Sequence, residues 1–445
     1  MTLSRDHDRT VPRPEDEVVE ICRRLIRFDT SNFGDSAEMV ERAAAEYVAE
    51  LLEDVGLQTT ILESVRGRTS VFARLEGSDS SRPALILHGH TDVVPAQAED
   101  WSVDPFAAEV HDGMIWGRGA VDMKDMVAMI LAVVRYVQRA GIQPPRDIIL
   151  AFFADEENAS QLGGRWIVDH HPEVFEGATE AIGEVGGYST TVAGRRVYLM
   201  QTAEKGLQWL RLIASGRAGH GSQINEDNAL VRLAEALARI GRHAWPLDLS
   251  PTVRQLLDGV ADLTGRSWSE EDEDTIWPLV EALGPARTFV GATLRTGVNP
   301  TQLAAGYKAN VIPTRAEATI DVRPIPGTEE DMLATIKRLA GPGITIEPVA
   351  QAIGLEVPFE GHLVDTMADL VLRHDPGARV LPYMLSAGTD NKPLHDLGIR
   401  GYGFTPLRLP EELDFPAMFH GVDERVPISA LTFGCRVLLD LVQEC

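Results

Sequence analysis

Apolar residues along the first half of the chain recur with two periods, that of a helix and that of a strand. Helical spacing is clear after Pro14, where acidic residues fill the first turn, and again in the long apolar segment that ends at Gly141. Short apolar runs bounded by turn residues have the length of strands. The pattern predicts helices over 14–28, about 37–55, about 122–141 and 162–170, and strands over 57–62, 69–75, 85–88, 147–154 and 179–182.

The order of these elements indicates an α/β fold. The run DIILAFFA at 147–154 is apolar at nearly every position, as in a strand buried on both faces of a parallel sheet. Strands also alternate with helices along this part of the chain. We therefore expect a mostly parallel central sheet flanked by helices, with the functional residues at the carboxyl ends of its strands.

The pattern changes near Gly206. Segments 207–214 and 314–323 alternate as half-exposed antiparallel strands do, and a helix is predicted over 227–241. The acidic stretch 267–274 reads as a solvated loop or helix start. We therefore interpret 206–325 as an inserted α+β domain. Residues 1–205 and 326–445 form the α/β domain, the latter part with helices over 329–339, 363–373 and from 428, and a strand over 344–347.

Composition narrows the class of protein. The chain has 445 residues, of which 44% are hydrophobic, enough for two or three domains. A formal charge of −26 disfavours nucleic acid as a partner, because phosphate binding needs clustered Lys and Arg. No apolar run has the length of a membrane span, the N-terminal residues lack the apolar core of a secretory signal, and the three cysteines are scattered. We expect a cytoplasmic protein without a membrane partner.

The stretch LILHGHTDVVP at 85–95 places polar side chains at the end of a buried strand. His90 and Asp92 are two residues apart, so an extended backbone directs them to the same side. An imidazole beside a carboxylate suits a metal site or a base with its orienting acid. The alternative is a His–Asp hydrogen bond with no further role.

More ionisable residues follow at the edges of predicted elements. Glu156 and Glu157 are adjacent after an apolar strand, and two carboxylates there repel each other unless a cation compensates. Asp122 and Glu184 would make the same site more negative. A pair of divalent cations resolves this conflict, and His nitrogens with carboxylate oxygens suit Zn²⁺, or Co²⁺ or Mn²⁺ in its place. The remaining member of this set is His420.

Five motifs of the chain, in this order, resemble those of the co-catalytic zinc amidohydrolases. That family includes aminoacylase, carboxypeptidase G, acetylornithine deacetylase and succinyl-diaminopimelate desuccinylase. The resemblance extends from about residue 15 to the C-terminus. The motifs are GHTDVVP (89–95), GRGAVDMK (117–124), ADEE (154–157), EVGG (184–187) and HGVDERVP (420–427).

The resemblance implies two Zn²⁺ ions per subunit. Asp122 would bridge them, with His90 and Glu184 completing one metal and Glu157 and His420 the other. Asp92 would orient His90 from behind. Glu156 would be the general base that takes a proton from the water between the metals and returns it to the leaving amine.

The resemblance also assigns roles to the inserted domain and implies a homodimer. The domain would be a ferredoxin-like dimerisation or lid domain, with the remainder of the chain catalytic. His220 would reach the partner subunit's active site and stabilise the oxyanion there. Asn310 and Arg323 would bind the substrate, although Arg323 could instead form a salt bridge with Asp321. Two residues of the catalytic domain, Gly388 and Thr389, would lie near the substrate.

These features predict a dinuclear zinc hydrolase that cleaves an amide bond of N-acyl amino acids or small peptides with a free carboxylate. An N-carbamoyl-amino-acid amidohydrolase and a non-catalytic metal-binding relative are the alternatives. A metal-free serine hydrolase is disfavoured, because no G-x-S-x-G motif occurs. Two features depart from the family pattern, namely Asp125 in place of the usual Gly and the segment FTPLRLP at 404–410.

Overall fold

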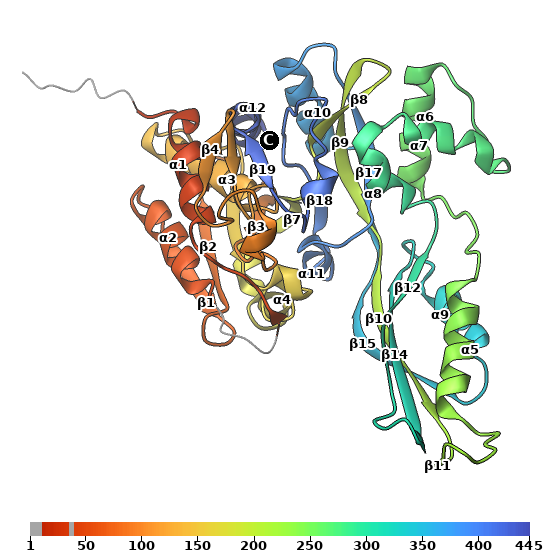
Figure 1. The fold of residues 1–445 in the computed structure, drawn as a ribbon. Coiled ribbons are helices and arrows are strands. Elements are labelled where there is room, and N and C mark those ends of the chain that lie inside the picture. Colours follow the sequence, from red (N-terminus) through yellow and green to blue (C-terminus); the bar gives the residue numbers. More distant parts are fainter. Residues whose placement is uncertain (1–10, 35–39) are drawn as a thin grey trace, which may run out of the picture. The chain divides into compact units, whose positions relative to one another are not determined.

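The computed structural model describes residues 11–34 and 40–445, and they form two compact units (Figure 1). The first unit contains the described residues up to Met200 together with Phe359–Leu381 and Thr389–Cys445. The second unit contains Gln201–Pro358 and Pro382–Gly388. The chain therefore passes from the first unit to the second and back twice.

A large mixed sheet forms the centre of the first unit. Its strands run in the order β1-β2-β6-β3-β7-β18-β9. The four central strands are parallel to one another, whereas β2 and β1 add antiparallel strands at one edge. The strands are β1 Thr59–Glu63, β2 Thr69–Leu75, β3 Ala84–His90, β6 Ile148–Phe153, β7 Ala178–Gly183, β9 Arg195–Glu204 and β18 Arg400–Gly403, and β8 Tyr188–Val192 pairs with β9.

Helices cover both faces of this sheet (Figure 1). The buried residues of β3 and β6 are apolar on both sides, so each face needs a covering layer. One layer is formed by α1 Pro14–Ile26, α2 Arg42–Glu53, α3 Lys124–Arg139 and α12 Ile428–Glu444, which contact one another. The other face is packed by α4 Gly164–His170 and α11 Asn391–His395. The expected α/β architecture is confirmed.

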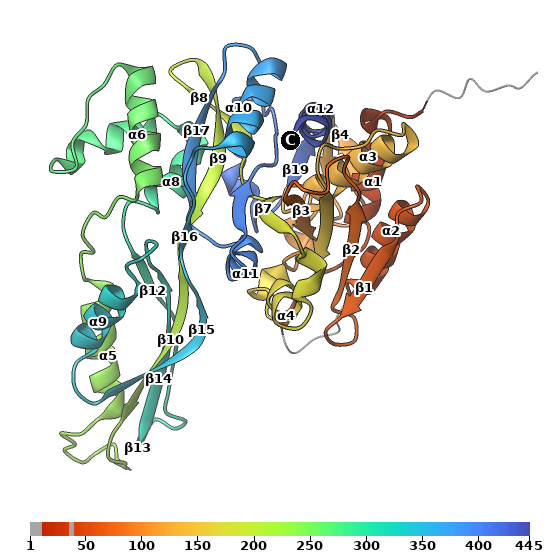
Figure 2. The same cartoon turned by 180° about the vertical axis from the view of Figure 1, so that it is seen from behind.

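The second unit is built on a four-stranded antiparallel sheet with two helices on one face (Figure 2). The spatial order β12-β14-β10-β15 and the chain order β10-α5-β12-β14-α9-β15 together define a ferredoxin-like fold. The elements are β10 Leu207–Ser215, α5 Ala229–Gly241, β12 Gly297–Ala305, β14 Arg315–Arg323, α9 Glu329–Ala340 and β15 Ile344–Ala352.

The structure divides the chain later than the expected boundary at residue 325. Strand β15 pairs antiparallel with β10, and α9 buries Met332 and Ile336 in the same core. Both elements are needed to complete the second unit, so 326–358 belongs to it and not to the α/β unit. A local hydrophobic pattern shows that a strand exists but not which sheet it joins.

Shorter elements complete the two units. In the second unit, α6 Pro251–Thr264, α7 Trp277–Glu281 and α8 Arg287–Gly291 follow α5, and the acidic stretch 267–274 is largely exposed, as expected of a solvated loop. In the first unit, α10 His362–His374 contacts α12. The predicted helix at about 37–55 begins at Arg42, and 35–39 lie outside the described residues. No helix among the described residues has the length and apolar character that a membrane crossing requires.

Candidate metal centre

The candidate ligands of the first unit follow the carboxyl ends of neighbouring strands. His90 ends β3, Glu156 and Glu157 follow β6, and Glu184 follows β7. Because β6, β3 and β7 are parallel neighbours, these three ends lie at one edge of the sheet. Asp122 comes from the loop before α3. The last residue, His420, follows the short helix Pro416–Met418.

His90 lies at the centre of one group of side chains. Its Nε2 atom is 3.3 Å from Asp122 Oδ1 and 3.4 Å from Glu184 Oε2. Glu156 is farther away, with Oε2 at 3.9 Å from the same nitrogen. The imidazole is completely buried. One nitrogen therefore faces three carboxylates.

The second oxygen of Asp122 faces a different histidine. Asp122 Oδ2 lies 3.3 Å from His420 Nε2, which is in turn 3.0 Å from Glu157 Oε2. Asp122 thus directs one oxygen at each imidazole. Two groups of candidate ligands that share this carboxylate are brought together, one with His90 and Glu184 and the other with Glu157 and His420.

The set of side chains fits divalent cations. His90 Nε2 and Glu184 Oε2 are buried and have no hydrogen-bond partner among the described residues. Potential ligand atoms of His90, Glu156 and Glu184 lie within 4.8 Å of one another, as do those of His90, Asp122 and Glu157. Such oxygen and nitrogen donors suit Zn²⁺, Co²⁺ or Mn²⁺. These distances leave Glu156 open as either a ligand or a base.

Burial and mutual repulsion dominate the electrostatics of the centre. Burial, with the charges of Asp122 and Glu157, raises the pKa of Glu184 to about 8. Burial and the charge of Glu184 likewise hold the pKa of Glu156 well above its usual value. Burial disfavours a charged His90, yet the surrounding carboxylates, Glu184 first, raise its pKa above the ordinary value. Bound cations would offset the mutual repulsion of these carboxylates.

Asp92 is placed differently from the expected His–carboxylate pair. His90 Nδ1 is 2.9 Å from the backbone oxygen of Asp92 and 3.5 Å from its carboxylate. That carboxylate instead accepts the backbone N–H groups of Glu156 and Glu157, both at 3.1 Å. Asp92 therefore fixes the turn that carries both glutamates, and its backbone carbonyl orients His90.

A buried network behind Asp92 contains residues that the sequence analysis missed. Asn32 Nδ2 donates to Asp92 at 2.8 Å, and Asn32 Oδ1 accepts from Arg68 Nη2 at 2.6 Å. Arg68 is also paired with Glu41. Asn32 and Arg68 come from segments outside the five motifs. Only their polar character within largely buried segments could have indicated them.

The candidate residues of the second unit do not all lie together. His220 and Asn310 are neighbours, because Gly219–His220 pairs with Val311–Ile312 in a small two-stranded sheet. Both side chains are exposed, and His220 Nδ1 is 2.8 Å from Ser222 Oγ. Arg323 lies at the far end of the nine-residue strand β14, whose first residue follows that small sheet. Its side chain forms the salt bridge with Asp321 at 2.7 Å.

The two departures from the expected family pattern lie near candidate ligands, Asp125 along the chain and the segment 404–410 in space. Asp125 is buried in the first turn of α3, three residues after Asp122. In the segment 404–410, Phe404 N donates to Gly183 O at 2.8 Å and Thr405 N to Gly186 O at 2.6 Å. That segment therefore packs along the backbone that carries Glu184. Thr389 is buried in the first unit, and Gly388 is the last residue of the second.

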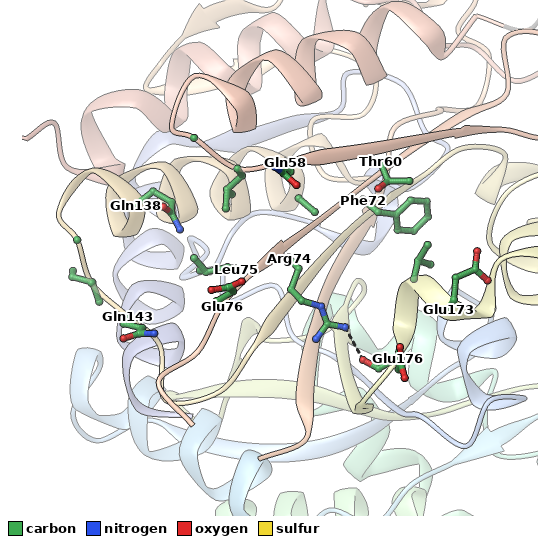
Figure 3. A pocket seen from close by; sticks show the side chains of 16 residues that line it. Gln58, Thr60, Phe72, Arg74, Leu75, Glu76, Gln138, Gln143, Glu173 and Glu176 are labelled. Carbon is green, nitrogen blue, oxygen red and sulfur yellow. Dashed lines mark hydrogen bonds between the residues drawn. The ribbon is translucent and has the colours of Figure 1, made fainter. Parts of the chain in front are cut away.

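A groove of about 1050 Å³ lies at the other edge of the sheet (Figure 3). Gln143 precedes β6 and Glu176 precedes β7, so the groove lies at the amino ends of these strands. Its Arg74 is paired with Asp147 at 2.8 Å and donates to the backbone of Glu176. No histidine or cysteine lines it. The groove is therefore separate from the candidate metal centre.

Comparison with known proteins agrees with this fold and centre. The model of Peptidase family M20/M25/M40 matches residues 86–444. An N-fatty-acyl-amino acid synthase/hydrolase of Xenopus tropicalis is 26% identical over 462 residues, covering 96% of this chain and 85% of the relative. Aminoacylase-1 of Sus scrofa is 27% identical over 416 residues, covering 90% and 89%. The solved M20 family metallo-carboxypeptidase of Sulfolobus solfataricus has a TM-score of 0.72 and 17% identity, covering 96% and 98%.

An α/β unit with a ligand-rich centre and a ferredoxin-like second unit defines a metal-dependent hydrolase. The chain belongs to peptidase family M20/M25/M40, whose model spans well over half of its residues. The resemblance seen in the sequence motifs is thereby confirmed.

Proposed function

We propose that the protein is a dinuclear zinc hydrolase that cleaves an amide bond of N-acyl amino acids or small peptides with a free carboxylate. The observation that carries this proposal is the arrangement around Asp122, whose two oxygens each lie 3.3 Å from a different imidazole nitrogen. The similarity to aminoacylase-1 and to a metallo-carboxypeptidase supports the substrate class. Co²⁺ or Mn²⁺ would suit the same donors.

The proposed ligands divide into two groups that share Asp122. His90 and Glu184 would hold one ion, and Glu157 and His420 would hold the other. When bound, the ions would lower the pKa of a water molecule and polarise the scissile carbonyl. Asp92 would keep the turn of Glu156 and Glu157 in place through the two N–H groups that it accepts.

Glu156 is the proposed general base. It lies beside the ligand groups, and burial raises its pKa above the usual carboxyl value, which suits a group that accepts and later returns a proton near neutral pH. Its carboxylate would take a proton from the attacking water. It would then deliver that proton to the nitrogen of the leaving amine.

The second unit would supply groups that recognise the substrate. Arg323 has the planar fork that pairs with a carboxylate, and a substrate carboxylate would compete with Asp321 for it. Asn310 and His220 lie side by side at an exposed two-stranded sheet, and the exposed apolar residues Ile224 and Tyr307 are within four positions of them in the chain. A second copy of the chain that covers this region would form a homodimer and receive His220 at its own active site. Gly388 and Thr389 are proposed to lie near the substrate.

The variant Glu156→Gln tests the proposal. It keeps the size of the side chain but cannot accept a proton, so kcat should fall by about 10²- to 10⁴-fold while metal content stays unchanged. Steady-state hydrolysis of N-acetyl amino acids and dipeptides measures the first quantity, and elemental analysis the second. Glu173→Gln, at an exposed glutamate, is the matched control. A Glu156→Gln protein with near wild-type kcat would rule out this residue as the base.

A further inference from the structure

Two proposed ligands, Asp122 and His420, come from loops about 300 residues apart in the chain. Both loops adjoin the same end of a small antiparallel sheet formed by β4 Glu109–His111, β5 Met114–Trp116 and β19 Arg425–Pro427. In that sheet Trp116 pairs with Arg425. The loop that leads to Asp122 leaves from Trp116, and the loop that carries His420 arrives at Arg425.

Glu424 connects the two loops through its side chain. Its carboxylate is fully buried, and Oε1 accepts N–H groups from Val121 at 2.7 Å and Asp122 at 3.2 Å. The other oxygen, Oε2, accepts from Gly119 N at 2.9 Å and from Arg118 Nη1 at 2.7 Å. One carboxylate from the His420 loop therefore shapes the backbone that leads to Asp122.

Arg118 makes the reciprocal connection. Its Nη2 donates to the backbone oxygen of Gly421 at 2.8 Å, directly after His420. The guanidinium also lies over the ring of Trp101, with 5.1 Å from Cζ to the ring centroid. Arg118 is 3% exposed, so it is held within the protein and neutralises Glu424 there.

His420 depends on these connections more than the other ligands do. His90 is the last residue of β3 and Glu184 directly follows β7, so the hydrogen bonds of the sheet fix the backbone beside each of them. The His420 side chain is 59% exposed, so packing does little to fix it. Its position is set largely by the backbone of its loop, which Arg118 holds at Gly421.

We propose that Glu424 and Arg118 are positioning residues that set the separation of Asp122 and His420, and so determine metal affinity at the group formed with Glu157. The inference rests on the proposed function, because it assumes that these side chains bind a metal ion. The hydrogen bonds that Arg118 donates and the four that the Glu424 carboxylate accepts together connect the two loops. This pair is hereafter called the Glu424–Arg118 clasp.

The variants Glu424→Gln and Arg118→Lys test the clasp. In Glu424→Gln, an amide NH₂ group replaces one of the two oxygens that accept hydrogen bonds. In Arg118→Lys, a single ammonium group replaces the planar guanidinium that reaches both Glu424 and Gly421. Zn²⁺ affinity of each site is measured by competition with a chromophoric chelator, and the absorption spectrum of the Co²⁺-loaded protein reports the ligand geometry. Each variant should weaken one of two sites by about 10- to 100-fold, alter the Co²⁺ spectrum and leave the other site near its wild-type affinity.

The control is Glu180→Gln, which breaks another largely buried pair, with Arg146, at the amino end of β7. It should lower the thermal unfolding midpoint without changing either metal affinity. If the clasp variants behave like this control, the clasp only stabilises the fold and the inference is overturned. A wild-type chain that binds fewer than two ions would instead overturn the proposed function. Arg118→Lys retains a buried charge, so it keeps the test decisive if Glu424→Gln does not fold.

Discussion

At the scale of single residues, burial sets the charge of this protein's carboxyl groups. Asp125 is fully buried and has no hydrogen-bond partner among the described residues. Burial, with the nearby charges of Glu424 and Asp122, raises its pKa to about 8. The Asp125 carboxyl is thus largely protonated at neutral pH, so its burial close to Asp122 does not add a full negative charge there.

Asp125→Asn should make the stability of the metal-free protein less dependent on pH. Between the ordinary carboxyl pKa of about 4 and the folded-state value of about 8, the unfolded chain releases a proton that the folded chain keeps. Wild-type stability therefore falls as pH rises through this interval. The variant does not titrate, so its stability relative to wild type should rise by about 3 kcal/mol between pH 5 and pH 8.

Thermal unfolding of both proteins in the presence of a chelator, at pH 5 and pH 8, measures this difference. Asp369→Asn is the control, because Asp369 is an exposed residue of α10. The same gap between Asp125→Asn and wild type at both pH values would show that Asp125 is ionised in the folded protein.

Three residues of the candidate centre could be expected to lie together, because each ends or closely follows a buried strand. His90, Glu157 and Glu184 are ionisable residues that stand at or shortly after the end of a buried strand. Asn32 and Arg68 could not be predicted in this way, since they lie in connecting segments and act on Asp92 only through tertiary contacts. Glu424 lies within a motif, yet its partners are backbone groups that no side-chain pattern reveals.

At the scale of elements, strands buried on both faces were predicted most successfully. Strands β3 and β6 are completely buried, so β6 and the first four residues of β3 are continuously apolar. Strand β12 was missed because nearly all of it is exposed, and it contains Pro300 at an irregularity in its pairing with β14. Its hydrogen bonds, not its side chains, make it a strand.

The sequence also does not show which unit contains α9 and β15, because a local pattern does not reveal the pairing partner of a strand. Residues 344–347 were identified as a strand, and the local sequence is equally compatible with either sheet. The antiparallel register with β10, from Ile344 opposite Ala214 to Ala352 opposite Leu207, decides the matter. Pairing between segments more than 100 residues apart lies beyond any local pattern.

At the scale of the whole molecule, the proposed homodimer gives His220 a role in the partner's active site. If so, a mixture of Glu156→Gln and His220→Ala subunits should be more active than either variant alone. In a mixed dimer, one active site would combine an intact Glu156 with the His220 of the Glu156→Gln subunit. His220 is exposed, so His220→Ala should lower kcat without lowering the thermal unfolding midpoint.

Activity measured after subunit exchange, with the oligomeric state followed by analytical ultracentrifugation, provides the test. A mixture no more active than the average of its two components would mean that His220 acts within its own chain or has no role. Ser222→Ala removes the hydroxyl beside His220 Nδ1 and is the matched control at the same exposed sheet.

Metal binding to the chelator-stripped protein shows whether Asp122 and the two histidines hold a pair of metal ions. Titration with Zn²⁺, followed by elemental analysis of the dialysed protein, should give two ions per chain and restore hydrolysis of N-acetyl amino acids or dipeptides. The geometry of Asp122, with one oxygen toward His90 and the other toward His420, predicts this number. A protein that binds no ion, or reaches full activity with one, would exclude a dinuclear centre at these residues.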